Sequence, residues 1–255
     1  PLGTGEDPEE NSYLVQCFSA GDCLDRELVI AMKVLDFALC SVPGAPLKQA
    51  LIDKGIGKDV YSMYDNGVKQ PYFGVVAKGT SAGREEEFKA VIKEVLEGIV
   101  KNGFDEKALF SAINHFEFKY READFGTTPK GLMYGLQMLD SWLYDDNKPF
   151  IHIEANETYA ALKRKAKEGY FEQIIQKYIL DNPHSGTLIL LPREGLAAKQ
   201  EAELKNKLAK IKAGMSEQEL ADVRAMMNRL DEFREKEDAP EDIAKIPLLS
   251  REDLK

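Results

Sequence analysis

The feature that most constrains this chain is an abrupt change of composition after residue 192. Of its 23 aromatic residues (12 Phe, 10 Tyr and 1 Trp), 22 precede residue 193, whereas residues 193–255 carry 28 charged side chains and one aromatic, Phe233. Because a hydrophobic core is built from large apolar side chains, only the first part can bury a sizeable one. We therefore predict a domain over residues 1–192, a helical hairpin over 193–238 and a linker tail over 239–255.

Composition excludes several kinds of partner. The chain has 44 acidic and 34 basic side chains, a net charge of −10, whereas nucleic-acid binding relies on clustered Lys and Arg. Charged residues interrupt every long apolar run, and none approaches the roughly 18 to 20 residues that a membrane helix needs. We therefore predict neither a nucleic-acid nor a membrane partner.

The cysteines Cys17, Cys23 and Cys40 are odd in number and contain no Cys-x-x-Cys pair. Neither a disulfide framework nor a zinc knuckle is indicated. No segment near residue 1 combines basic residues with an apolar signal core, so no targeting segment is recognised. The prediction is a reducing compartment, most simply the cytoplasm.

The first part of the chain shows the patterns of strands at both of its ends. Residues 12–20 and 185–191 are rich in β-branched, aromatic and aliphatic side chains. Residues 58–64 and 71–78 flank the turn triplet Asp-Asn-Gly at 65–67, which predicts a β-hairpin.

Between these strands, apolar residues recur at helical spacing. The helices predicted in this way cover residues 25–40, 47–53, 85–102, 105–120, a segment after Pro129, 159–167 and 170–180. The order is strand, two helices, hairpin, several helices, strand, which is not a series of βαβ units. It predicts an α+β fold with helices packed on one face of a mainly antiparallel sheet.

The charged part of the chain has two helical stripes. Leu204, Leu208 and Ile211 form the first, and Leu220, Val223, Met227 and Leu230 form the second. Ser216, followed three residues later by Glu219, has the form of a capping box that begins the second helix. We predict an antiparallel helical hairpin that buries little apolar surface by itself.

No catalytic motif is present in the sequence. The histidines His115, His152 and His184 do not fall in a spacing that places two metal ligands on one helical face, and no nucleophile elbow or phosphate loop occurs. His115 is interpreted as a half-buried, hydrogen-bonded side chain of an amphipathic helix. We assign no catalytic residue and no metal ligand, and predict that the chain alone is inactive.

Three residues remain as structural or interdomain candidates. Arg121 and Asp124, in FKYREADFG, could belong to a catalytic cluster, but such residues more often pair to hold a helix end. Trp142, in SWLYDD, could form a ligand platform, although an aromatic on a Leu-rich helix is more often part of a core.

Six ordered segments carry a resemblance to a known family. They are PGAPL (43–47), GIGKDV (55–60), YDNGVKQPYF (64–73), FKYREADFGTTPKGL (118–132), SWLYDDNKPF (141–150) and IPLLSREDL (246–254). They resemble the second, non-catalytic domain and the helical linker of the presequence-protease branch of the pitrilysin/insulinase (inverzincin) zinc metallopeptidases, which have a processing-peptidase-like fold.

The resemblance implies a two-halved metalloendopeptidase whose halves close around a peptide in a chamber. In that family an inverted His-x-x-Glu-His motif and a downstream glutamate of the first domain bind zinc, and none of these residues occurs here. The expected partners are thus a catalytic first domain, a C-terminal half and peptide substrates, with zinc bound upstream and none in this chain.

The expected function is that of a non-catalytic domain and inter-half linker in an enzyme that degrades peptides, forming part of the chamber wall. The alternative is a stand-alone, non-enzymatic binding or scaffold module with the same fold. The length of the natural gene product separates the two, because only the first reading requires a much longer protein.

Overall fold

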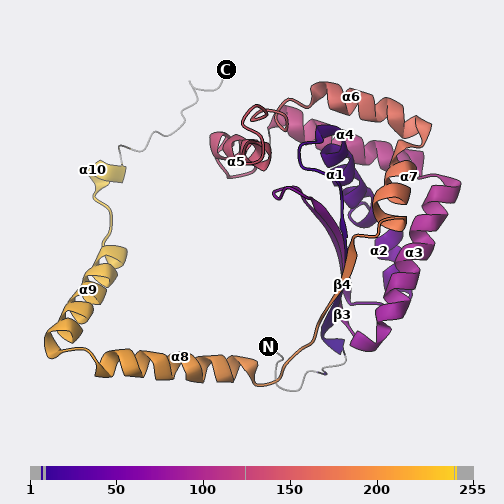
Figure 1. Ribbon diagram of the computed structural model, residues 1–255. Helices are drawn as coiled ribbons and strands as arrows, with labels where there is room; N and C mark the ends of the chain where they lie inside the picture. The colour runs from indigo at the N-terminus through magenta and orange to yellow at the C-terminus, as the bar shows by residue number, and fades with distance from the viewer. Residues whose placement is uncertain (1–6, 8–9, 124, 244, 246–255) are drawn as a thin grey trace. The chain divides into compact units, whose positions relative to one another are not determined.

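The computed structural model describes residues 7, 10–123, 125–243 and 245 (Figure 1). The chain divides into two compact units, Pro1–Glu194 and Gly195–Lys255. Most of the predicted tail over 239–255 lies outside the described residues, which include one short helix there, α10 (Pro240–Ile243). Among the described helices, none has the length and apolar character needed to cross a membrane.

The first unit has four described strands and a layer of helices. The strands are β1 (Ser12–Ser19), β2 (Asp59–Asp65), β3 (Tyr72–Thr80) and β4 (Ser185–Leu190). The helices are α1 (Arg26–Cys40), α2 (Pro46–Asp53), η2 (Ala82–Arg84), α3 (Glu85–Asn102), α4 (Glu106–Glu122), α5 (Lys130–Trp142), α6 (Asn156–Lys165), η3 (Ala166–Glu168), α7 (Tyr170–Ile175) and the π-helix η4 (Gln176–Leu180).

The sheet is antiparallel throughout, with strand order β2-β3-β1-β4. Its two central strands, β1 and β3, pair over their whole length, and β4 joins the other edge of β1. The segment between β3 and β4 is therefore a long helical excursion that returns to the sheet beside its first strand. The predicted α+β architecture is confirmed.

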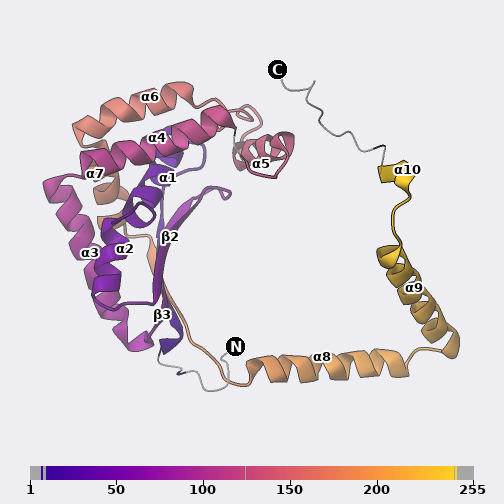
Figure 2. The same cartoon turned by 180° about the vertical axis from the view of Figure 1, so that it is seen from behind.

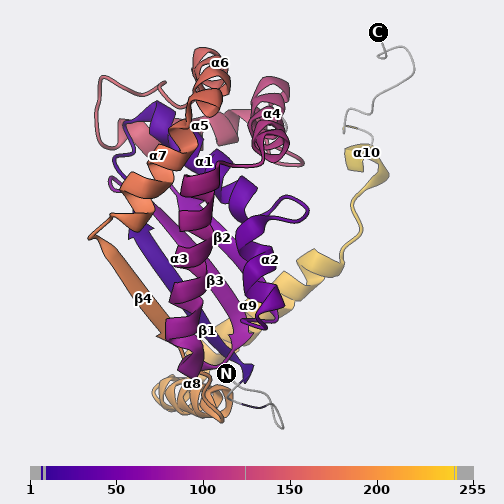
Figure 3. The same ribbon diagram turned by 90° about the vertical axis from the view of Figure 1, so that its right-hand side faces the viewer.

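One face of the sheet carries the core. Leu14, Val60 and Ala77 lie in one row across β1, β2 and β3 and are fully buried. Helices α1 and α2 pack on β2, and α3 packs on β1, so the predicted placement of helices on one face is confirmed (Figures 2 and 3). Because α1 lies between the sheet and α4, most of its residues are buried.

Helix ends follow the expected capping chemistry. Asp25 accepts a hydrogen bond from the Leu28 N–H at the start of α1, and Asp105 accepts one from Ala108 at the start of α4. Gly103 ends α3 with φ +82°, a conformation that glycine adopts without steric cost.

Helix α5 differs from the other long helices of this unit. Its apolar residues are exposed, and Ser141 is the one buried residue in it. The exposed fractions are 56% for Leu132, 48% for Leu136, 40% for Leu139 and 47% for Trp142. The interpretation of Trp142 as a core residue is therefore wrong, because within the described chain nothing covers that side of α5.

The second unit contains α8 (Leu196–Ala213) and α9 (Glu217–Glu235). The capping box at Ser216 and Glu219 is confirmed, with reciprocal bonds between side chains and backbone N–H groups. Both helices are fully described, and neither has a buried residue. The exposed fractions of Leu208 (55%) and Met227 (48%) are typical of the two stripes, so the predicted helices form but their apolar faces do not close on each other.

Two glycines give a matched test of backbone constraint. A Cβ at Gly57, where φ is +89°, would lie 3.1 Å from the Asp59 carbonyl oxygen and 3.2 Å from that of Lys78, whereas a Cβ at Gly98 in α3 meets nothing within 4 Å. We expect Gly57→Ala to lower the free energy of unfolding by about 1–3 kcal/mol. Gly98→Ala should raise it by about 0.5–1 kcal/mol, and urea unfolding measures both. Equal effects of the two variants would contradict this reading of Gly57.

The exposed helices of the second unit predict where the chain is cut. Limited proteolysis of the dilute chain should cleave first within residues 199–233, because local opening is least costly where no side chain is buried. Mass spectrometry of the earliest fragments locates the cuts. Earlier cleavage inside α1 or α3 would show that the helices of the second unit are better protected than their exposure indicates.

Candidate functional site

The side of the sheet away from α1, α2 and α3 is the candidate functional surface, called here the open face. It is defined by alternate strand residues, which point to the same side of a sheet. These are Tyr13, Val15, Cys17, Tyr61, Met63, Gly74, Val76, Leu188 and Leu190. In Figure 1 the helices of the first unit lie on the other side, with α5 beside the turn between β2 and β3.

The middle of the open face is an apolar row that crosses all four strands. Val76 pairs with Tyr61 on one side and with Val15 on the other, and Val15 pairs with Leu188. Val76 is buried by its neighbours, whereas Tyr61 and Leu188 at the sheet edges are 38% and 56% exposed. Apolar surface of this kind on a sheet usually contacts another protein element or a ligand.

The next row contains the one cysteine on this face. Cys17 pairs with Gly74 and Gly186, and its Sγ lies 3.2 Å from the position that a Gly74 Cβ would occupy. Burial raises the pKa of the Cys17 thiol, so at neutral pH it is protonated and weakly nucleophilic. The open face can therefore bind, but its described residues provide no activated nucleophile.

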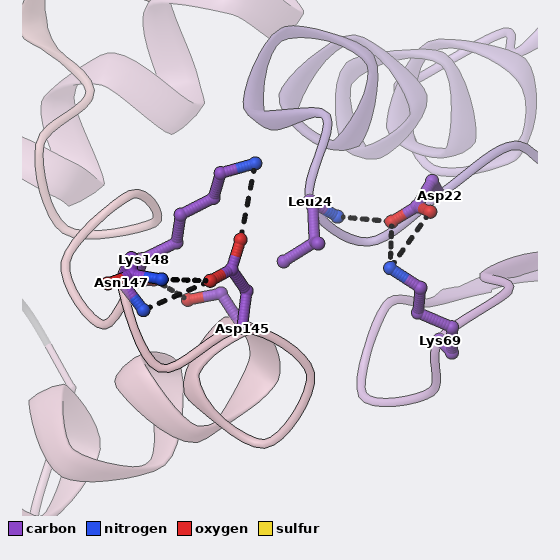
Figure 4. A network of polar contacts seen from close by, with 7 residues as sticks. Asp22, Leu24, Lys69, Asp145, Asn147 and Lys148 are labelled. Atoms are coloured by element: carbon purple, nitrogen blue, oxygen red, sulfur yellow. Dashed lines mark hydrogen bonds and ion pairs between the residues drawn. The ribbon is translucent and has the colours of Figure 1, made fainter.

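Polar contacts fix the loops beside the turn between β2 and β3 (Figure 4). Asp22 accepts a hydrogen bond from the Leu24 N–H and pairs with Lys69 at 3.0 Å. Burial by itself would raise the pKa of Asp22, but these hydrogen bonds and the lysine charge outweigh it and lower the pKa. The aspartate is thus held ionised, which ties the end of β1 to this turn.

The loop after α5 has a similar aspartate. The Asn147 N–H donates to Asp145, and Lys148 pairs with the same carboxylate at 3.6 Å. The hydrogen bond from Asn147 is the main cause that lowers the pKa of Asp145. Tyr144 donates to the Gly67 carbonyl oxygen, which links this loop to the turn between β2 and β3. Both networks are structural, because each charge already has its partner.

The structure separates the three candidate residues taken from the sequence. Arg121 donates to Glu117, one turn earlier on α4, with N···O distances of 3.0 Å and 2.7 Å. Asp124 lies outside the described residues, and Trp142 lies on the exposed side of α5. No shared site joins Arg121 to Trp142 in the described chain, and their roles stay a prediction.

The histidines lie apart from one another. His115 is exposed and stacks on Phe37 with ring centroids 4.5 Å apart, so the expectation of a half-buried, hydrogen-bonded side chain is wrong. His184 is exposed beside Asn182, whereas His152 has a buried Nε2 without a hydrogen-bond partner. Within residues 7, 10–123, 125–243 and 245, no group of three or more His, Cys, Asp or Glu could hold a metal ion.

Two family models match the chain. The model described as "Peptidase M16 inactive domain" matches residues 4–115. A second model, for the segment associated with subgroup C of the M16 peptidases, matches residues 190–255. The first match includes β1, β2 and β3, and the second includes α8 and α9.

Longer proteins contain a similar sequence. Protein HypA of Clostridium perfringens (strain 13 / Type A) is 40% identical over 253 residues, which are 99% of this chain and 26% of that protein. Presequence protease 1, chloroplastic/mitochondrial, of Arabidopsis thaliana is 34% identical over 236 residues, which are 91% of this chain and 22% of that protein. The chain thus spans about a quarter of the length of these curated relatives.

Solved structures share the fold. The inactive peptidase domain from Bordetella parapertussis has a TM-score of 0.58 at 12% identity, covering 76% of this chain and 100% of that chain. A protease from Helicobacter pylori has a TM-score of 0.51 at 15% identity, covering 73% of this chain and 42% of that chain. At these identities the likeness establishes the fold alone.

A helix-backed sheet that matches inactive peptidase domains defines the class of this chain as a non-catalytic peptidase domain. The chain belongs to the peptidase M16 family of metallopeptidases, as an inactive domain followed by the segment associated with subgroup C, and is similar to presequence proteases. The predicted resemblance is confirmed. The stand-alone module is not favoured, because the relatives carry this sequence within much longer proteins.

The pairs around Glu117 predict a pH-dependent contribution to stability. Glu117 on α4 accepts from Lys163 on α6 and from Arg121, and the bond from Lys163 is the main cause that lowers its pKa. The resulting stabilisation is fully present above the ordinary value of 4.5 and is lost as the pH falls through the lowered pKa.

We expect Glu117→Gln to lower the free energy of unfolding by about 1 kcal/mol at pH 7, because the pairs are only partly exposed. The difference from the parent chain should disappear in acid. Glu122→Gln, at an exposed position on the same helix, is the matched control and should have little effect. Urea unfolding across pH measures both, and a deficit that persists unchanged in acid would contradict the assignment.

Proposed function

We propose that this chain is the non-catalytic domain and inter-half linker of a zinc-dependent metalloendopeptidase that degrades peptides, with the open face forming part of the wall of the peptide chamber. Residues 1–192 would be the second domain of the N-terminal half, residues 193–238 the helical linker and residues 239–255 its tail. The expected partners are the catalytic first domain and the C-terminal half of the same protein.

The observation that carries this proposal is the asymmetry of the sheet. All of its core-forming contacts with helices are made on one face, while Tyr61, Leu188 and Leu190 on the other remain 38%, 56% and 47% exposed. A sheet face of this kind is stable in water, yet its apolar and aromatic side chains suit contact with an extended peptide.

Charge contributes less to this wall than the net charge of the chain suggests. Asp59 pairs with Lys48 at 3.2 Å, and Lys78 lies over the Tyr13 ring, 5.8 Å from its centroid. Asp65 accepts hydrogen bonds from the Gly67 N–H and from the Tyr72 hydroxyl. Because these charges are balanced or bonded locally, apolar contact should outweigh long-range attraction of basic peptides.

Zinc must then come from another part of the same protein. The described residues do not fit a zinc ion, since they offer no cluster of three or more potential ligands. The catalytic water and its general base therefore belong to a domain outside this chain. This assignment agrees with the family description of the matched domain as inactive.

The compartment is proposed from the cysteines alone. Cys17, Cys23 and Cys40 are all free thiols, and Cys23 and Cys40 are buried. A reducing compartment keeps such thiols unpaired, and the cytoplasm is the simplest one.

The wall is tested in the full-length protein with the double variant Leu188→Thr/Leu190→Thr. Loss of apolar contact should raise KM for apolar peptides several-fold while kcat and zinc content stay near the parent values, because only substrate binding changes. Steady-state kinetics with a quenched fluorescent peptide measure both constants.

Ile52→Thr is the matched control, because Ile52 is 37% exposed but lies on α2, on the helical side of the sheet. It should leave KM unchanged. Equal KM values for the double variant and the parent would remove the open face from the substrate path.

A further inference from the structure

A second site candidate lies behind the sheet, in a cavity of about 250 Å³ between α5 and the layer formed by α1, α4 and α6. Its polar lining consists of Lys33 from α1, Lys119 from α4, Tyr134, Gln137 and Asp140 from α5, and His152 from the loop before α6. Apolar engineered cavities of about 150 Å³ already hold a benzene ring, so this volume can hold an aromatic ring with a short polar tail.

One wall of the cavity is held by few contacts. Within the described chain, α5 has no extensive packing against another helix or strand. It is attached mainly at its ends, where Asn66 donates to Asp140 at 2.8 Å and the Phe125 ring packs edge-on against Tyr134. A ligand could therefore enter under α5 without disrupting the core that α1 forms with the sheet.

The polar groups at the base of the cavity are incompletely satisfied. The Lys33 ammonium is partly buried, and no hydrogen-bond or ion-pair partner for it occurs among the described residues. Burial lowers the pKa of Lys33, while Asp140 and Asp65 act in the opposite direction from a longer distance. The His152 Nε2 is buried without a partner in the same cavity.

These two groups define what the cavity lacks. A desolvated ammonium without a partner is costly, and an anion bonded to it restores much of the lost solvation. The same anion would favour the protonated form of His152, whose Nε2 could then donate to it. Aromatic side chains such as Phe116 and Tyr120 line the rest of the cavity and suit an apolar body.

We propose that the cavity beneath α5 binds a carboxylate carried on a small aromatic or apolar body, with Lys33 and His152 bonding the carboxylate. Two sources share this chemistry, a free aromatic acid and the C-terminal carboxylate of a short peptide with an aromatic last residue. The site is separate from the open face and does not depend on the function proposed for it.

Isothermal titration of the 255-residue chain tests the proposal with matched ligands. 3-Phenylpropionate should bind saturably, and 3-phenylpropionamide should bind at least about tenfold more weakly, because the amide cannot accept a charge-assisted bond from both groups. The peptide Ala-Ala-Phe is compared with its C-terminal amide in the same way. Binding of the free peptide alone would identify the peptide terminus as the source, and binding of both acids would identify a general carboxylate site.

Variants locate the binding. Lys33→Met should keep the chain folded in urea unfolding, since it removes a buried charge, and should abolish the preference for the acid over the amide. His152→Gln should weaken acid binding several-fold. Lys107→Met, at an exposed position on α4 outside the cavity, should behave like the parent. Equal binding of acid and amide, or no binding of either acid at millimolar concentration, would overturn the proposal.

Discussion

The pairing of β1 with two strands that are distant in sequence is the constraint on which the rest of the first unit depends. β1 bonds to β3 on one side and to β4 on the other, so residues 12–19 are joined to residues 185–190 across almost the whole unit. Everything between β3 and β4 must leave the sheet and return, and it does so as helices stacked over one face. The core and the open face are two consequences of this single topology.

The two faces have different physical roles. On the helical face, Leu14, Val60 and Phe73 are fully buried and supply stability. On the open face, exposed Leu188 and Leu190 add little to the stability of the isolated unit, so their apolar character is better explained by contact with something else. The exposed stripes of α8 and α9 fit the same explanation, because a short helical pair cannot bury them.

Sequence reasoning predicted most of the fold because local chemistry specified it. The stripe of α3, the cap at Asp105 and the turn at residues 65–67 each act over a few residues. It was wrong for Trp142, because helical periodicity identifies an apolar face without saying what covers it. The cavity beneath α5 was missed since Lys33 and His152 lie far apart in sequence, and no short motif joins them.

The central claim is that this chain is a peptidase-family domain without a zinc site of its own. Elemental analysis of the purified, zinc-treated 255-residue chain tests it most directly, after free metal has been removed. We expect a zinc-to-protein ratio close to zero. About one zinc per chain, lost when His115 or His152 is replaced, would contradict this expectation and would place a metal centre within this chain.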